Sequence, residues 1–201
     1  MKTKRQANRK SKKQQILEKA IEVFANKGSS QTTIADIAQK ANIAQGTIYV
    51  YFDSKGDLLN ECLQEIVDPI IKSIIESTKD IKDPMDRLYE FFIQHISLIK
   101  DKPYVARFLC METRQHEEFY VKWPDYNPLK QYLEYVKLTT LEAIETKRIR
   151  NLDPDAFAYM IVGMMDLTMS QWFMNPGNVD ISSLAVSIRD IIRYGTLPRE
   201  N

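Results

Sequence analysis

The sequence predicts an all-α fold of about nine helices. Its 201 residues are 44% hydrophobic and 10% aromatic, which is ample for a folded core. Six Gly and eight Pro are few for this length, and no repeat of fixed period appears. Strict two-residue alternation of β-branched residues, which marks half-buried strands, is missing as well. Helices joined by short loops are therefore expected along the sequence.

Charge divides the chain into two parts. The formal net charge is +1, but residues 1–60 carry eleven Lys or Arg against five Asp or Glu, a net of about +6. The remaining residues carry seventeen against twenty-two, a net of about −5. A basic first part followed by a mildly acidic body indicates a nucleic-acid surface on the first part.

Residues 33–52 are predicted to form two short helices joined by a tight turn. Thr33 can cap the first helix while the Asp36 side chain reaches back, which is a capping-box arrangement. Asn42–Ala44 breaks the helical pattern before the second helix begins. Apolar residues on the first helix follow at i, i+3, i+4 and i+7, namely Ile34, Ile37, Ala38 and Ala41. This organisation is typical of a helix-turn-helix, an element that reads DNA.

The second helix of the pair has an unusual outer face. Ile48 and Phe52 point inward, while the outer positions carry Gly, Thr, Val and Tyr where a solvated helix usually carries Lys and Glu. A helix approaches base edges in the major groove only when its exposed side is slim, and Gly46 and Thr47 provide this clearance. Because Arg and Lys are missing from this helix, no bidentate guanine contact is expected from it.

The first thirteen residues are the most basic segment. They hold seven Lys or Arg and no acid, and they offer almost nothing to bury, so a flexible arm is predicted. Charge runs often serve only solubility, but this one directly precedes a DNA-reading element, which favours nonspecific contact with phosphates. If three or four charges engage, the slope of log affinity against log salt steepens by about 3.

Capping signals and prolines place the other helices. Gly28 ends the first helix, and Ser54 opens the fourth, in which Pro69 is expected to cause a bend around residues 65–68. Asp83-Pro84 and Lys102-Pro103 open the next two helices. Besides the pair within 33–52, the expected helices cover about 12–27, 55–75, 84–100, 103–115, 128–147, 154–174 and 180–194, with 116–128 mostly a loop.

Residues 16–65 resemble the DNA-binding domain of the TetR family of bacterial one-component regulators. The resemblance rests on Phe24, Gly28, Thr32-Thr33 and the run from Gly46 to Leu59, which follows the pattern Gly-Thr-Ile-Tyr-x-Tyr-Phe-x-x-Lys-x-x-Leu-Leu. Only Gly56 departs, since the family often has Glu there. After the arm predicted over 1–13, the resemblance implies a helix-turn-helix domain over 14–58 and a helical ligand-binding and dimerisation domain over 59–201.

The resemblance also implies a function. Proteins of this family are most often repressors that bind a palindromic operator in double-stranded DNA as homodimers and are released by a small hydrophobic ligand. For Tyr49 and Tyr51, burial against the first helix is the alternative to a phosphate contact. The expected DNA-binding residues are Thr33, Gln45, Gly46, Thr47, Tyr49, Val50, Tyr51 and Lys55.

Aromatic residues are frequent in the region that corresponds to the family's regulatory domain. Most of them are expected in the core, but aromatic walls with a few polar groups also suit a ligand pocket. The run Met111–Gln115 is similar to a branch of the family that responds to long-chain fatty acyl-CoA. The candidate pocket residues are Phe92, His95, Phe108, Met111, Glu112, Gln115 and Trp123.

The last two expected helices carry more apolar residues than one buried face requires. In the family these helices pair across a two-fold axis, whereas packing within one protomer is the alternative. The candidate dimer interface consists of Phe157, Met160, Met164, Met165, Trp172, Leu184, Ile188 and Ile191.

Other classes of function receive little support. Cys62 and Cys110 lack metal-site spacing and are expected to be reduced in a cytoplasmic protein, and no metal or cofactor is expected. His116–Tyr120 begins like a zinc-protease helix but has Tyr120 in place of the second His, so no enzyme is predicted. No signal peptide or membrane span is recognised. A ligand-independent architectural DNA-binding protein, or a membrane-surface protein using the basic arm, remains as an alternative.

Overall fold

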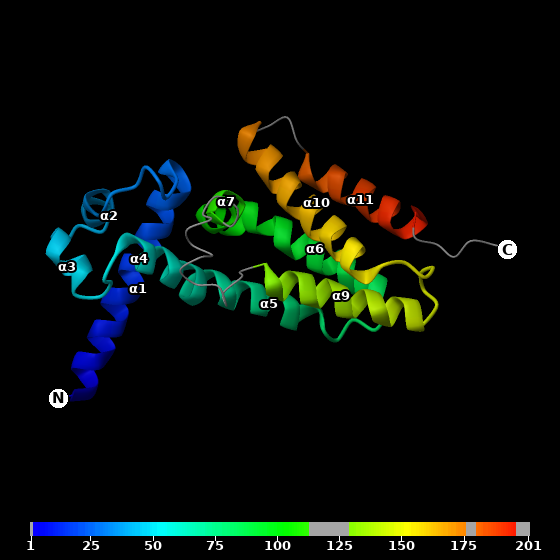
Figure 1. Cartoon of the computed structure of the whole chain (residues 1–201), viewed down its shortest axis with the longest axis horizontal. Coiled ribbons are helices and arrows are strands. Elements are labelled where there is room, and N and C mark those ends of the chain that lie inside the picture. Colours follow the sequence, from blue (N-terminus) through cyan, green and yellow to red (C-terminus); the bar gives the residue numbers. More distant parts are fainter. Residues whose placement is uncertain (1, 113–128, 176–179, 196–201) are drawn as a thin grey trace. The chain divides into compact units, whose positions relative to one another are not determined.

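The structure, a computed structural model, describes residues 2–112, 129–175 and 180–195, with side chains from residue 7 onward. Every element in these ranges is helical (Figure 1). The chain divides into two compact units. The first comprises residues 1–70 and a segment that begins at Arg107, and the second contains Ile71–Ala106 and the residues from Asn127 to the C-terminus.

The first unit contains α1 (Lys2–Lys27), α2 (Ile34–Lys40), α3 (Gln45–Tyr49) and α4 (Lys55–Cys62). Helix α1 packs against α2 and α4, and α2 packs against α3. The core is formed by fully buried side chains, among them Phe24, Ile37, Ile48 and Leu58. These residues fall at the helical spacing that the sequence pattern indicated, so the helix pair and its inner face are confirmed.

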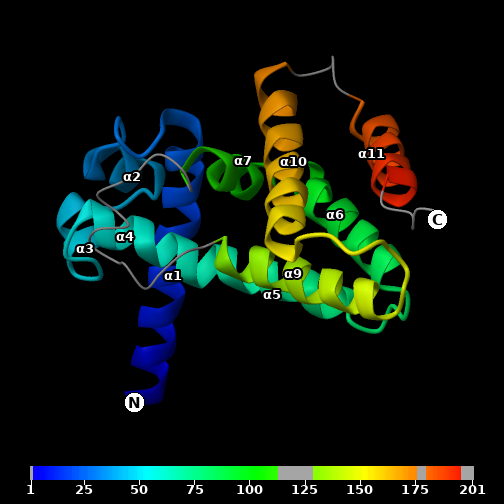
Figure 2. The same ribbon diagram turned by 45° about the vertical axis from the view of Figure 1, so that its right-hand side comes forward.

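Helix α1 is longer than predicted. The sequence favoured a flexible arm over residues 1–13, whereas the structure continues α1 to Lys2, well before the expected start at residue 12 (Figure 2). The segment contains no Gly or Pro and is rich in Lys, Arg, Gln and Ala, which are good helix formers. Because residues 16–24 are held by packing, extending the helix avoids the cost of nucleation.

A π-helical segment, η1 (Leu63–Val67), separates α4 from α5 (Asp68–Thr78). The backbone N–H of Asp68 donates to the carbonyl of Leu63, five residues earlier. Pro69 follows directly, and because proline has no N–H and clashes with the preceding turn, regular α-helical bonding is interrupted here. The sequence predicted a bend around residues 65–68, and the structure has a wider, π-helical turn at this place.

The second unit contains the part of α5 from Ile71 onward, α6 (Pro84–Asp101), α9 (Lys130–Glu145), α10 (Pro154–Met174) and α11 (Ile181–Gly195). Helix α7 (Pro103–Glu112) begins in this unit and passes into the first at Arg107. Helix α10 packs on α9 and α6, and α11 packs on α6. Aromatic rings fill the space between α6 and α9, where the ring centroids of Phe91 and Tyr135 lie 4.7 Å apart.

Aspartate-proline pairs start two of these helices, and the pair Asp83-Pro84 was predicted to do so. Asp83 accepts hydrogen bonds from the backbone N–H groups of Met85 (2.8 Å) and Asp86 (3.2 Å), with Pro84 in the first turn. Asp153 caps α10 in the same way, at 2.9 Å from the N–H of Asp155 and 3.0 Å from that of Ala156. The side chain satisfies donors that have no partner within the helix, while proline supplies the φ angle that the first turn needs.

One ion pair ties α6 to α9 more firmly than the others. The Arg87 guanidinium lies 2.7 and 3.1 Å from the two carboxylate oxygens of Glu142, and its Nε donates to the Ile81 carbonyl at 3.0 Å. Replacing Arg87 by Met should therefore lower the free energy of unfolding by about 1–3 kcal/mol, measured by urea denaturation. Lys137→Met removes a single exposed pair with Asp155 and is the control, with an expected loss under about 1 kcal/mol. Equal losses of unfolding free energy in the two variants would mean that the Arg87–Glu142 pair is no stronger than the exposed pair.

Candidate functional site

The start of α2 is fixed by a reciprocal cap. The N–H of Asp36 donates to the Thr33 hydroxyl oxygen (3.2 Å), and Asp36 Oδ2 accepts from the Thr33 N–H (2.9 Å) and hydroxyl (2.8 Å). Lys27 Nζ lies 2.6 Å from Asp36 Oδ1 and ties the end of α1 to the same carboxylate. The hydrogen bonds from Lys27 and then from Thr33 lower the pKa of Asp36 to about 2. The predicted capping box is confirmed.

The turn between α2 and α3 has a defined geometry. Asn42 adopts a φ of 53°, the left-handed region that Asn tolerates better than most residues. The N–H of Ile43 donates to the Ala38 carbonyl (3.0 Å), and the N–H of Thr47 donates to the Ala44 carbonyl (2.9 Å). Since Ile37 and Ile48 are fully buried, the two helices are held together from the inside. Helix α3 is thus presented rigidly.

The outer face of α3 is open and uncharged. Gln45 and Gly46 are exposed, as are Tyr49 (56% exposed) and Val50 (64% exposed), while Thr47 is half-buried. A Cβ atom built on Gly46 would meet no heavy atom within 4 Å. Large apolar side chains exposed on so short a helix indicate a contact surface. The structure therefore brings these five predicted residues together on one accessible edge, and Tyr49 is not buried against α1.

Tyr51, which follows α3, lies beside α1. It is half-buried, and the guanidinium carbon of Arg9 lies 5.8 Å from the centroid of its ring. A cation at this distance from a tyrosine ring is attracted to its face. The first half of α1 and the end of α3 therefore belong to one continuous surface of the first unit.

Lys55 is directed to the loop that connects α1 and α2. Its Nζ donates to the carbonyls of Ser29 (2.7 Å) and Thr32 (2.9 Å). From another side, the buried carboxylate of Glu112 accepts the N–H of Ser29 at 2.9 Å. The structure thus gives Lys55 an internal role that the sequence did not reveal, because the pattern cannot tell which way a long side chain turns. Its contact with phosphate stays a prediction.

The candidate pocket residues do not form one cluster within a single unit. Phe92 and His95 belong to the second unit, and the buried Phe108 and Glu112 and the half-buried Met111 belong to the first. Gln115 and Trp123, and also the zinc-protease-like segment 116–120, lie outside the described residues. Phe108 packs on Phe24, with ring centroids 6.1 Å apart.

His95 is a buried, neutral histidine. Its Nδ1 lies 2.8 Å from the hydroxyl of Tyr132, and the two rings meet edge to face. Burial lowers the pKa of His95 to about 3 because the charged imidazolium would lose its hydration. Tyr132 was not among the predicted site residues, although its inward position follows from the helical spacing of α9.

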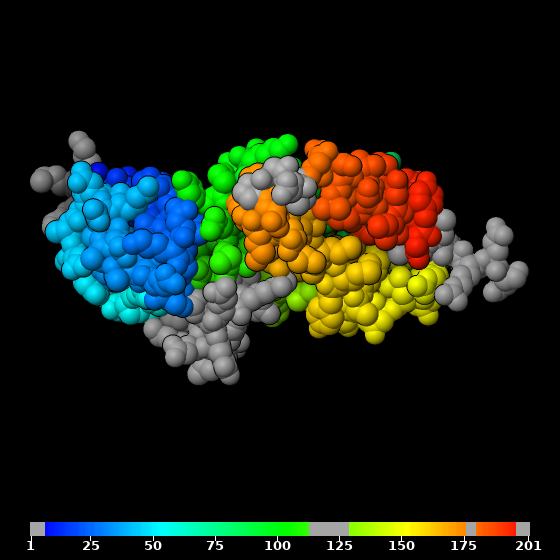
Figure 3. Space-filling view, turned by 90° about the horizontal axis from the view of Figure 1, so that it is seen from above, coloured from blue at the N-terminus to red at the C-terminus, as the bar shows by residue number. Residues whose placement is uncertain are grey.

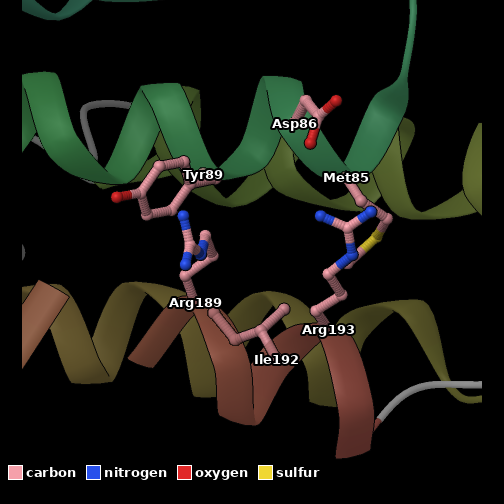
Figure 4. Close-up of a pocket in the computed structure, with 6 residues that line it drawn as sticks. All are labelled: Met85, Asp86, Tyr89, Arg189, Ile192 and Arg193. Atoms are coloured by element: carbon pink, nitrogen blue, oxygen red, sulfur yellow. The ribbon is translucent and has the colours of Figure 1, made fainter. Parts of the chain in front are cut away.

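A small groove lies between α6 and α11. It is lined by Met85, Asp86, Tyr89, Arg189, Ile192 and Arg193, and the Arg189 guanidinium sits 5.3 Å from the Tyr89 ring centroid (Figure 4). Its volume of about 20 Å³ is that of roughly one water molecule, too little for an organic effector.

Helices α10 and α11 both reach the surface of the second unit (Figure 3), and several of their exposed side chains are apolar. On α10, Met160, Met164, Leu167 and Met174 recur at intervals of four, three and seven; on α11, Ile191 and Tyr194 are each about two-thirds exposed. Such spacing lines one face of a helix. Of the predicted interface residues, Met160, Met164, Trp172, Leu184 and Ile191 are at least partly exposed, whereas Phe157, Met165 and Ile188 are buried within the protomer.

Among residues 2–112, 129–175 and 180–195, no helix is both long enough and apolar enough to cross a bilayer. In the same ranges, no group of three or more His, Cys, Asp or Glu side chains is placed to hold a metal ion.

Comparison with known proteins gives matches along most of the chain. Residues 16–62 match the bacterial regulatory proteins of the tetR family, and residues 63–195 match the C-terminal region of the YsiA-like proteins. The fatty acid metabolism regulator protein of Bacillus subtilis (strain 168) is 29% identical over 188 residues, which cover 93% of this chain and 96% of the relative. A probable acrEF/envCD operon repressor of Escherichia coli (strain K12) is 27% identical and covers 94% of this chain and 88% of its own length.

Solved structures agree with these matches. The transcriptional regulator FadR from Bacillus subtilis in complex with stearoyl-CoA superposes with a TM-score of 0.80 and 30% identity, over 90% of this chain and 98% of FadR. FadR from Bacillus halodurans gives a TM-score of 0.79 and 26% identity over 90% of this chain and 94% of its own. The chain is therefore a DNA-binding transcriptional regulator of the TetR family, with a C-terminal region of the YsiA-like type.

Proposed function

We propose that this chain is a repressor that binds a palindromic operator as a homodimer and releases it when it binds a long-chain fatty acyl-CoA. One observation carries the choice of effector: the likeness, at 30% identity over 90% of the chain, to a regulator whose structure holds stearoyl-CoA. The relative that regulates fatty acid metabolism in Bacillus subtilis supports the same choice.

We assign recognition of the operator's bases to α3 and the residues after it. Gln45 can pair with an adenine edge, Thr47 can donate or accept, and Val50 can contact a thymine methyl group. Tyr49 and Thr33 are proposed to bind phosphates and so fix the register. A single α3 of five residues covers only part of a site, which is why two copies, about 34–36 Å apart, would read a two-fold symmetric operator.

The dimer is assigned to the exposed apolar face of α10 and α11. Met160, Met164 and Leu167 on α10 and Ile191 on α11 offer side chains that water solvates poorly, and Gly163 between them has open space around it. A two-fold interface uses the same patch on both subunits, and burial of this row would remove an apolar surface that a monomer leaves exposed.

Residues of the second unit suit the acyl chain. Phe92 is buried on α6, and His95 is kept neutral beside Tyr132, so an acyl chain entering this layer would meet apolar side chains and one polar hydroxyl-imidazole pair. Apolar walls with few polar groups are typical of sites for hydrophobic ligands. We propose that binding is stoichiometric and that the thioester leaves unchanged, which makes the protein a sensor and not an enzyme.

The test is operator binding by fluorescence anisotropy with effectors added. The operator is first delimited by footprinting of the DNA upstream of the protein's own gene. Stearoyl-CoA should weaken binding about 5–150-fold, the range of a coupling of 1–3 kcal/mol. Free CoA, free stearate and a hydrophobic cation are the controls and should have little effect. Operator binding that no acyl-CoA alters would favour the ligand-independent architectural protein, and release of free CoA with multiple turnovers would indicate an enzyme.

A further inference from the structure

The two halves of α1 bury very different amounts of surface. From Ile16 onward the helix contributes fully buried residues to the core, whereas residues 7–11 are exposed. At 1.5 Å per residue, the part from Lys2 to Lys13 is about 16 Å long. Because residues 7–11 are exposed, this segment gains little stability from packing within the chain. Its side chains are therefore available to bind another molecule.

The cations of this segment are not spread evenly around the helix. Successive residues turn by 100°, so positions separated by three or four share a face. Five of the seven cations fall within an arc of about 100°, while Lys4 and Lys10 lie outside it. We call this arc the cationic stripe; it comprises Lys2, Arg5, Arg9, Lys12 and Lys13. It continues the face that carries Ile16 and Ala20 in the core.

One end of the cationic stripe lies beside the residues that follow α3. Arg9 lies over the ring of Tyr51, and Lys13 Nζ lies 5.8 Å from the ring centroid of Phe52 and pairs with Glu61. Tyr51 and Phe52 come two and three residues after the end of α3. The stripe therefore extends the surface that carries α3, and in Figure 2 the first turns of α1 project away from α2, α3 and α4.

The charge pattern is unfavourable for an isolated helix. Helices usually carry acidic residues in their first turn, whereas α1 has none, and the first acid in the chain is Glu18. Like charges at a spacing of four, as in Arg5 with Arg9 and Arg9 with Lys13, repel each other. A polyanion beside the stripe supplies the negative charge that the first turn of α1 lacks. It also replaces the repulsion between the cations by attraction to the polyanion.

We propose that the cationic stripe binds the phosphates of the duplex that flanks each operator half-site. This inference rests on the proposed operator binding and adds a second DNA contact to it. A duplex is the fitting polyanion because the stripe is continuous with the helix that reads bases. Over about 16 Å it can follow roughly five base pairs, at 3.4 Å for each. Phosphate contacts carry no base information, so the stripe adds affinity and leaves sequence preference to α3.

The experiment compares two double variants that remove equal charge. Arg5→Gln with Arg9→Gln neutralises the stripe, and Lys4→Gln with Lys10→Gln neutralises positions outside it, while Gln preserves helix propensity in both. Each protein is titrated against a minimal operator and an operator with eight further flanking base pairs on both sides, over a range of salt.

Wild type should bind the longer duplex about tenfold more tightly than the minimal one. R5Q/R9Q should lose most of this gain, and the slope of log affinity against log salt should fall by about 2, since each phosphate contact contributes about 0.9. K4Q/K10Q should keep the gain, and both variants should keep the preference for operator over scrambled DNA.

Equal effects of the two double variants would overturn the proposal, since general electrostatics would then explain them. So would a wild-type protein that binds both duplexes equally. If the minimal operator is bound and released by stearoyl-CoA without any flank gain, only the cationic stripe is refuted. If neither duplex is bound, operator binding itself fails. Loss of binding to vesicles containing phosphatidylserine in R5Q/R9Q, with unchanged DNA binding, would assign the stripe to a membrane instead.

Discussion

Replacing Gly46 by Leu is expected to weaken operator binding at least a hundredfold without unfolding the protein. The loss corresponds to about 2.7 kcal/mol of binding free energy. Gly46 lies on the exposed face of α3, and a side chain there would occupy the space through which the backbone approaches base edges. Nothing within 4 Å of the added Cβ opposes the substitution in the free protein, and Leu is a better helix former than Gly.

The effect should grow with the size of the added side chain. Gly46→Ala is the graded control and is expected to lose about tenfold, measured with the same duplex by anisotropy, while thermal unfolding confirms that each variant is as stable as the wild type. Because the added side chain keeps α3 away from the base edges, a higher protein concentration should not restore the variant's preference for the operator over other DNA. A leucine variant that binds with wild-type affinity would mean that α3 does not enter the groove.

Acid is expected to destabilise the protein through His95. In the folded chain burial holds the pKa of His95 at about 3, whereas in the unfolded chain it is about 6.5. Below pH 6.5 the unfolded state binds a proton that the folded state rejects, so the stabilisation present above this pH is lost progressively as the pH falls toward 3. Between pH 7 and pH 5 the free energy of unfolding should drop by about 2 kcal/mol.

Urea denaturation at several pH values measures this loss. His95→Gln retains a group that can hydrogen-bond the Tyr132 hydroxyl but has no charge to gain, so this variant should lose about 2 kcal/mol less than the wild type between pH 7 and pH 5. The variant is expected to be less stable at pH 7 because its side chain fits the site less well. Parallel pH profiles for the two proteins would show that another group is responsible.

Local signals were sufficient for much of the fold. Thr33 with Asp36, Asp83 with Pro84 and Asp153 with Pro154 start helices at the predicted positions, because caps depend on a few neighbouring residues. Pro69 likewise indicated where α-helical bonding would be interrupted. The exposed face of α3 could also be predicted, since Ile48 fixes which side is buried.

The features that could not be predicted from the sequence depend on packing between residues far apart in the chain. Helix α10 is apolar on almost all sides, so its periodicity does not separate the buried Phe157 and Met165 from the exposed Tyr159 and Leu167. The role of Glu112 depends on a loop 83 residues away, to whose Ser29 N–H it is hydrogen-bonded. The helical first half of α1 was missed because a basic, unburied segment was read as an arm, although it continues a helix that the core already holds.

Sequence selectivity tests the role of α3 most directly. Gln45→Ala combined with Val50→Ala removes two proposed base contacts and leaves Tyr49, Thr33 and the cationic stripe in place. The ratio of affinities for operator and scrambled duplex should fall at least tenfold, because base contacts specify and phosphate contacts position, while the affinity for the scrambled duplex stays unchanged. An unchanged ratio in this double variant would contradict the assignment of DNA reading to α3.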